Sequence, residues 1–312
     1  MGIKEDIQKS FKEGTTLTKL IYINLGVFVV IKLIVVILTL FNIGLDLTKF
    51  LMSHNLISIP RGPIEHSSWT RLLMLPAEFG MILRTPWTFI SYMFFHEGFI
   101  HILFNILMLY WFGRLFLSFF SQKDLVGLYL IGGFLGGVFY ILAYHTFPYF
   151  ADNIAGSYLH GASASVMAII VAVAVTSPNH LIRLLFFGEV QLKWIAFAAV
   201  IISLLRANSD NAGGEIAHLG GAVAGYIFAV RYKKGSNITA WVNGMLDKLV
   251  DLFKRKPKMR VTHQRPMTDQ EYNLRKRQEN ENIDRILEKI KRGGYESLSK
   301  EEKQALFHAS QR

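Results

Sequence analysis

The sequence contains no cysteine, and no aspartate lies inside its long apolar stretches apart from their ends. Without cysteine, a disulfide framework, a thiolate nucleophile and a zinc–thiolate site are all excluded. Without embedded aspartates, the paired acids of an aspartic protease inside a membrane are excluded as well. A cleavable signal peptide is also not expected, because residues 1–19 are charged and the first apolar run, 20–41, is too long.

The composition is that of a membrane protein. Hydrophobic residues make up 51% of the 312 residues, which is more than the surface of a soluble domain normally allows. About 20 apolar residues cross the hydrocarbon core as a helix. We predict an all-α, polytopic bundle of six spans, of which the fourth and fifth are short, at residues 20–41, 94–118, 125–147, 160–177, 194–206 and 213–232.

The positive charge is concentrated behind the last apolar stretch. Residues 231–312 carry 20 Lys and Arg against 11 Asp and Glu, most of the net charge of +11. This position favours a membrane explanation over nucleic-acid binding, which we do not expect. The loops that would share a side with this tail are also basic, with Lys19 and Lys123 among them. The positive-inside rule therefore predicts that both termini are cytoplasmic.

This topology places four polar side chains at one depth. The second, fourth and sixth spans run from outside to inside, and each carries polar residues near its start. Polar groups inside a membrane are costly and are candidates for function. They are His101 and Asn105, Ser163, and His218.

His101 and Asn105 are four residues apart and so share one helix face. Both side chains can donate hydrogen bonds, so together they could stabilise an oxyanion. Interhelical hydrogen bonding is the alternative, and it is the better explanation of this pair taken alone.

Ser163 and His218 could form a nucleophile and its general base. Around His218, small residues recur at every fourth position, which lets the sixth span approach a neighbour closely. If that neighbour is the fourth span, the imidazole could reach the serine hydroxyl. Gly161, two positions before the serine, would allow close approach of a substrate backbone. Four glycines between 132 and 137 are interpreted as packing alone.

Two other classes fit less well. A zinc protease needs two histidines four residues apart, whereas His96 and His101 are five apart, about 140° around a helix. No metal site is therefore predicted. A transporter would have its polar residues near the midplane and often shows an internal repeat, and neither feature is evident here.

Three separated motifs, in this order and spacing, resemble the rhomboid intramembrane serine proteases. The resemblance extends over residues 20–232 and is carried by His96-x4-His101-x3-Asn105, Gly161-x-Ser163-Ala164, and Ala217-His218-x-Gly220-Gly221-x3-Gly225.

The resemblance implies a Ser163–His218 dyad without a third, acidic member. The Ser163 backbone N–H, His101 and Asn105 would stabilise the oxyanion, and water would release the acyl group. The implied substrates are transmembrane proteins cut near the outer interface, and no cofactor is implied. Gly161, His96 and Met167 are expected to support the site.

Three positions depart from the family pattern. Ala164 stands where glycine often follows the serine, and Met167 stands where an aromatic residue often underlies the histidine ring. Thr88 follows Trp87 where the family has arginine, which leaves open how the first loop is bonded. We expect that loop, which contains apolar residues throughout, to dip into the outer leaflet.

The cytoplasmic tail is predicted to contain two parts. Residues 233–267 would form an amphipathic helix on the membrane surface, with Trp241, Met245 and Leu249 on its apolar face, followed by a linker. Two capping boxes, at Thr268 and Ser299, predict a helical hairpin over 268–312. A hairpin this small has little core, so it is a candidate for binding a cytoplasmic partner.

The sequence thus predicts an intramembrane serine endopeptidase, most simply in a bacterial cytoplasmic membrane. The alternatives are a catalytically silent rhomboid-like protein that binds membrane clients and, less favoured, a transporter. Intact Ser163 and His218 argue against the silent form.

Overall fold

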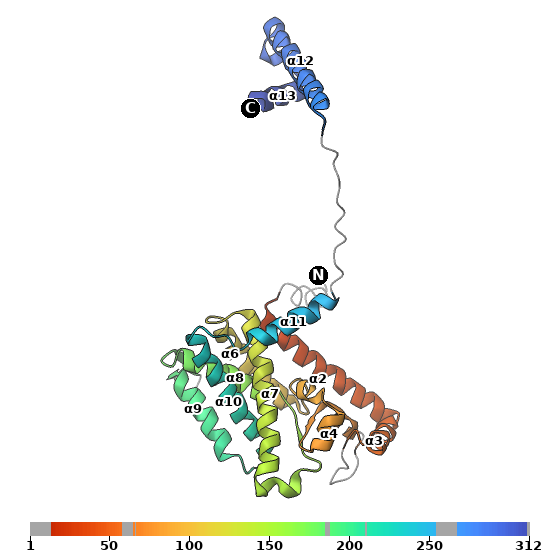
Figure 1. Ribbon diagram of the computed structural model, residues 1–312, viewed down its shortest axis with the longest axis vertical. Helices are drawn as coiled ribbons and strands as arrows, with labels where there is room; N and C mark the ends of the chain where they lie inside the picture. The colour runs from red at the N-terminus through yellow and green to blue at the C-terminus, as the bar shows by residue number, and fades with distance from the viewer. Residues whose placement is uncertain are drawn as a thin grey trace. The chain divides into compact units, whose positions relative to one another are not determined.

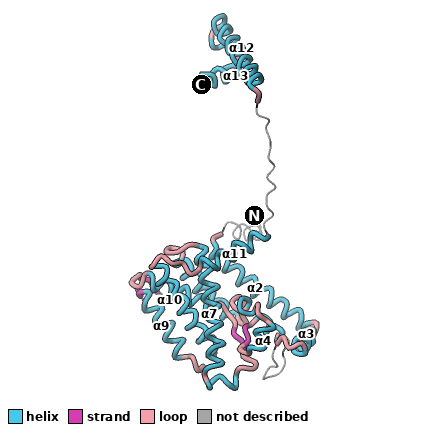
Figure 2. Tube along the Cα trace, viewed as in Figure 1, coloured by secondary structure: helices cyan, strands magenta, loops and turns pink. Residues whose placement is uncertain are grey.

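The computed structural model describes residues 14–57, 65, 67–184, 188–209, 211–253 and 267–310, and these are mainly helical (Figures 1 and 2). Most of the predicted N-terminal segment, the basic run that begins at Lys254 and the linker up to residue 266 lie outside the described residues. The chain divides into two units, residues 1–254 and 255–312, which are treated separately below.

The first unit is a bundle of helices with short connections. Its helices are α2 (Thr16–Leu40), α3 (Ile43–Ser53), α4 (Phe79–Arg84), α5 (Thr88–Ser91), α6 (Phe99–Phe116), α7 (Gln122–Thr146), α8 (Ser163–Thr176), α9 (Leu192–Leu205), α10 (Ala212–Lys233) and α11 (Ala240–Phe253), with 3-10 turns η1 (Ser68–Leu73) and η2 (Pro148–Asn153).

Two small antiparallel sheets, which the sequence did not predict, accompany the helices. β1 (Leu75–Pro76) pairs with β2 (Tyr158–Leu159), and β3 (Leu181–Leu184) pairs with β4 (Gly188–Gln191). The first pair matters for the site, because it ties the first loop to the segment that leads into α8.

Each predicted apolar stretch coincides with a helix, in the order α2, α6, α7, α8, α9 and α10. By length and composition, α2, α6 and α7 can cross a membrane. The helices α8 and α9 have only 14 residues each. The full count of six spans therefore stays a prediction.

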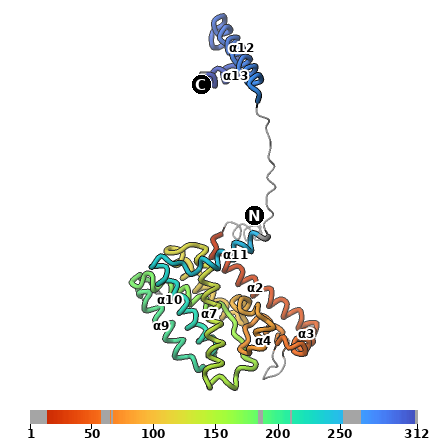
Figure 3. Tube along the Cα trace, in the orientation of Figure 1, coloured from red at the N-terminus to blue at the C-terminus, as the bar shows by residue number. Residues whose placement is uncertain are grey.

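Small residues fix the directions of α7, α8 and α10. A Cβ at Gly136 would lie 2.6 Å from the Ala164 Cβ, and one at Gly132 would overlap Ala168, so α7 and α8 are antiparallel. On α10, a Cβ at Gly221 would overlap the Ala164 carbonyl, and one four residues later would overlap the Ala168 carbonyl. The helices α8 and α10 are therefore parallel and in contact. Figure 3 shows α7 alongside α10. The predictions that the α7 glycines serve packing and that the α10 stripe approaches a neighbour closely are confirmed, and the neighbour of α10 is the fourth span, α8.

The bundle has two distinguishable ends. At one, which we call the α11 end, the start of α2 bonds the start of α7 through Thr16 and Gln122 (N···Oε1 2.9 Å). There too Lys233 near the end of α10 donates to the Val175 carbonyl at the end of α8 (2.7 Å). The starts of α6, α8 and α10 lie at the opposite end, which we call the pocket end.

The first loop folds on itself more than expected. Of the apolar residues expected in the outer leaflet, the following are buried in protein instead: Leu51, Ile57, Leu75, Met81 and Ile82. Leu83 and Phe79 do stay exposed, at 82% and 54%. The Trp87 indole donates to the Leu72 carbonyl (2.9 Å), and the buried Thr88 hydroxyl donates to the Thr85 carbonyl (2.6 Å). The loop is therefore bonded without the family's arginine.

Helix α11 packs on α7 by one face only. Val242 is buried, and Lys123 pairs with Asp247 (2.7 Å). The predicted apolar face with Trp241 and Met245 stays exposed, at 66% and 50%. An exposed apolar face is compatible with the predicted position on a membrane surface.

The second unit contains α12 (Asp269–Gly293), η3 (Tyr295–Ser297) and α13 (Lys300–Ser310). Both predicted capping boxes are confirmed, at Thr268 with Glu271 and at Ser299 with Glu302. Ile286 and Leu298 are buried between the helices, whereas Leu287 and Phe307 are exposed, at 49% and 60%. The core of this unit is accordingly small, as predicted.

Candidate functional site

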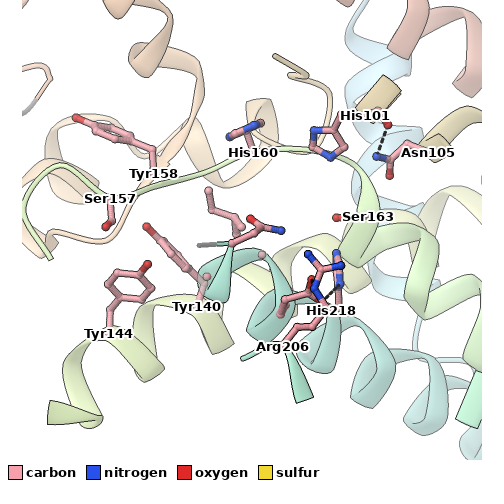
Figure 4. Close-up of a pocket in the computed structure, with 15 residues that line it drawn as sticks. His101, Asn105, Tyr140, Tyr144, Ser157, Tyr158, His160, Ser163, Arg206 and His218 are labelled. Atoms are coloured by element: carbon pink, nitrogen blue, oxygen red, sulfur yellow. Dashed lines mark hydrogen bonds and ion pairs between the residues drawn. The ribbon is translucent and has the colours of Figure 1, made fainter. Parts of the chain in front are cut away.

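A cavity of about 440 Å³ lies at the pocket end (Figure 4). Residues from α6, α7, α8, α9 and α10 and from the strand before α8 line it. They are His101, Asn105, Tyr140, Tyr144, Ser157, Tyr158, Leu159, His160, Ser163, Arg206, Asn211, Gly213, Gly214, Glu215 and His218. The four polar residues that the sequence placed at one depth are thus brought together.

The turn before Ser163 requires glycine. Gly161 has φ +109°, a conformation that side chains rarely adopt, and its N–H donates to the Tyr92 carbonyl (2.8 Å). A Cβ there would lie 2.7 Å from two atoms of the His101 ring. The absence of a side chain therefore lets the turn pass directly beneath His101.

His96 holds the same turn from the other side. Its Nε2 accepts the Ala162 N–H (3.3 Å), while Nδ1 lies 3.3 Å from the Phe94 carbonyl and can donate to it. A neutral His96 with its proton on Nδ1 satisfies both contacts. His96 lies before the first residue of α6, so the angle of about 140° around a helix, which was predicted to separate it from His101, does not apply. The two rings lie 5.1 Å apart.

His101 and Asn105 stand one turn apart on α6, as predicted. The Asn105 amide donates to the His101 carbonyl (2.9 Å), which leaves its second N–H available. In Figure 4 both residues lie on one side of Ser163, and His218 lies on the other.

Ser163 is the first residue of α8, and His218 lies in the second turn of α10. Among the described residues, the Ser163 hydroxyl has no hydrogen-bond partner. The His218 ring is held through Nδ1, which lies 3.1 Å from the Ser203 hydroxyl and 3.2 Å from a Glu215 carboxylate oxygen. Its Nε2 has no partner in the described part of the chain. Met167 is buried in the core and is not among the residues that line the pocket.

Comparison with known proteins gives this site a family. Residues 83–234 match the Rhomboid domain family. These residues belong to the rhomboid family. A relative, the RHOMBOID-like protein 12, mitochondrial, of Arabidopsis thaliana, is 30% identical over 159 residues, which cover 47% of this chain and 47% of the relative. The chain therefore spans about half the length of that relative. Residues 267–312 match a family of unknown function (DUF6576).

The rhomboid domain contains every pocket residue named above, from His101 to His218. Three helices within the described residues are long and apolar enough to cross a membrane, and with the rhomboid match they make this an integral membrane protein. The match begins after α2 and most of the first loop, so it is shorter than the resemblance over 20–232 suggested.

The sequence did not predict one acidic and one basic residue of this pocket, Glu215 and Arg206. Glu215 contacts His218 through one carboxylate oxygen and Arg206 at the end of α9 through the other (3.3 Å). The expectation that no acidic residue partners the histidine is therefore wrong for the structure. The spacing of Glu215 and His218, three residues apart on one helix, was the available signal.

His160 and three tyrosines were missed as well. The His160 ring lies 5.5 Å from that of His101, and its Nε2 lies 3.6 Å from a Glu97 carboxylate oxygen. The tyrosines at 140, 144 and 158 form the far wall of the pocket. Within the described residues, no group of His, Asp and Glu is arranged to hold a metal ion.

The chemistry available in this pocket is that of acyl transfer. A hydroxyl without a partner, an imidazole with Nε2 available and a set of N–H donors share one cavity. Acyl transfer requires a nucleophile, a base and donors for an oxyanion, and groups of these three chemical types are present in the pocket.

Proposed function

We propose that the protein is a rhomboid-type intramembrane serine endopeptidase with Ser163 as nucleophile and His218 as general base. The observation that carries the proposal is the single pocket shared by His101, Asn105, Ser163 and His218, which come from three helices. The substrates would be transmembrane proteins, cleaved near the outer interface.

In the proposed reaction, the Ser163 Oγ attacks the scissile carbonyl carbon while its proton passes to His218 Nε2. The oxyanion accepts hydrogen bonds from the Ser163 N–H, the second N–H of Asn105 and His101. Collapse of this intermediate breaks the C–N bond, and His218 returns the proton to the leaving amine. Water then attacks the acyl-enzyme, again with His218 as base, and releases the carboxylic acid and Ser163.

The proposal is tested by incubating the purified protein in liposomes with a reference transmembrane substrate. We expect cleavage by the wild type, and none by Ser163→Ala. The matched control is Ser165→Ala, since Ser165 is a buried serine on the same helix that does not line the pocket. Equal cleavage by wild type and Ser163→Ala would contradict the proposal. Binding of substrates without any cleavage would favour a client-binding protein, and substrate flux that survives Ser163→Ala would favour a transporter.

We further propose six spans, both termini in the cytoplasm of a bacterial cell, α11 on the inner membrane surface and the 268–312 hairpin in the cytoplasm. The absence of cysteine makes this directly testable, because a single introduced cysteine has no background. In intact cells, a membrane-impermeant maleimide should label Asp152→Cys in the loop before α8 but not Gly235→Cys after α10. Labelling in the reverse order would overturn the orientation.

A further inference from the structure

The Glu215 carboxylate occupies an unusual position in the pocket. It is only 5% exposed, and its two oxygens face different cations or potential cations. One oxygen lies 3.2 Å from His218 Nδ1, and the other lies 3.3 Å from the Arg206 Nε. A buried carboxylate is expensive unless both of its oxygens are partnered, and here they are.

The contact with Nδ1 has a consequence for the other ring nitrogen. A neutral imidazole carries one proton, so donation from Nδ1 to the carboxylate leaves Nε2 as an acceptor. An acceptor at Nε2 is what a base facing Ser163 needs. When the ring takes the serine proton it becomes a cation, and a carboxylate beside it stabilises that cation.

We propose that Glu215 is a positioning residue, which holds His218 in the reactive tautomer and orientation and stabilises the imidazolium formed during attack. This inference rests on the proposed protease function and deepens it, since the acid acts through His218 and does not touch the substrate.

Two residues of α9 complete the arrangement. The Ser203 hydroxyl lies 3.1 Å from the same Nδ1, and Arg206 fixes the second carboxylate oxygen. The carboxylate is thus held between α9 and α10, which restricts its rotation and that of the ring. In other functional sites, contacts behind a reactive group likewise fix its orientation before the reaction begins.

A merely structural role for Glu215 would have a different consequence when the residue is replaced. In that case Glu215 would only join α10 to α9 through Arg206, and its loss would lower stability without a specific effect on turnover. Asp124 provides the matched control, since it is another buried carboxylate (3% exposed) that joins helices but lies at the α11 end.

The test uses the full-length protein in liposomes, with two readouts. The first is kcat and KM for a transmembrane substrate, and the second is the rate at which a fluorophosphonate probe labels Ser163. We expect Glu215→Gln to lower kcat and the labelling rate about 10- to 100-fold, with KM changed by no more than about twofold. Glu215→Asp should recover part of the rate, because it restores the charge on a shorter side chain. Asp124→Asn should keep the kcat of the wild type per folded molecule.

Two results would overturn the inference. One is a Glu215→Gln variant that keeps the wild-type kcat and labelling rate. The other is a loss of cleavage in Glu215→Gln that disappears once the rates are expressed per folded molecule and that accompanies a lower Tm, since that would make the carboxylate a helix tether. A wild-type protein whose Ser163 is not labelled would contradict the proposed function itself, and the inference with it.

Discussion

The two ends of the helical bundle each bury a carboxylate among the described residues, but the partners of the two carboxylates differ. At the α11 end, Asp124 accepts hydrogen bonds from Ser121, Asn237 and Thr239, at 2.7 Å for each side chain. These donors are neutral. At the pocket end, Glu215 faces His218 and Arg206 and borders a cavity.

This difference in partners distinguishes a carboxylate with a structural role from one that can take part in proton transfer. A carboxylate satisfied by neutral donors has no partner whose protonation can change, so it can only join segments. A carboxylate beside an imidazole is coupled to a group that can gain or lose a proton. Burial is nearly equal at the two ends, so the identity of the partners, and not burial, distinguishes the two roles.

The largest effect is expected from a substitution at the pocket end, at His218. His218→Ala removes the proposed base, so the cleavage rate should fall about 10⁴-fold or more. Because Glu215 acts through this ring, adding Glu215→Gln should cause little further loss. Rates of substrate cleavage for the two single variants and the double variant test this. Losses that multiply in the double variant would show that the two residues act independently.

The next effect concerns the contact that brings Ser163 and His218 together. In Gly221→Ala the new Cβ would overlap the Ala164 carbonyl, so α8 and α10 must separate. We expect unfolding free energy to fall by about 1–3 kcal/mol, and cleavage to fall by about 10²-fold if the displacement reaches about 1 Å. Gly244→Ala on α11 is the control, because no atom lies within 4 Å of its Cβ position. Thermal unfolding and cleavage measure both effects, and equal behaviour of the two variants would contradict the packing account.

At the α11 end, Asp124→Asn should act on stability alone. Loss of a buried hydrogen-bonding carboxylate lowers the unfolding free energy by about 1–3 kcal/mol. Since Asp124 is remote from the cavity, kcat per folded molecule should be that of the wild type. Chemical denaturation followed in the same detergent as the kinetics is the measurement. A fall in kcat without a fall in stability would remove the contrast between the ends.

Much of the pocket could be predicted because it depends on periodicity. Apolar runs predicted the helices, and the four-residue stripe that ends at Ala229 correctly predicted that α10 approaches a neighbouring helix closely; the structure identifies that helix as α8. The helices α8 and α10 are parallel, and Ser163 and His218 each lie near the start of their helix. The two residues must therefore lie at the same end of the bundle. The alternating directions of successive membrane spans predicted the same end from the sequence alone.

The missed residues depend on contacts that periodicity does not encode. Glu215 lies at the start of a span, where a charge is easily explained as marking the boundary. Its partner Arg206 lies on another helix, and only the packing of α9 on α10 brings the two together. His160 enters the pocket because β2 pairs with β1, a two-residue strand too short to leave a pattern.

The most direct test of the central claim is labelling of the folded protein with a fluorophosphonate, followed by peptide mapping. The Ser163 Oγ would attack phosphorus and expel fluoride, with the proton taken by His218. The account predicts a phosphonate on Ser163 in the wild type and its loss in His218→Ala. A phosphonate on another residue, or undiminished labelling of Ser163 in His218→Ala, would contradict it.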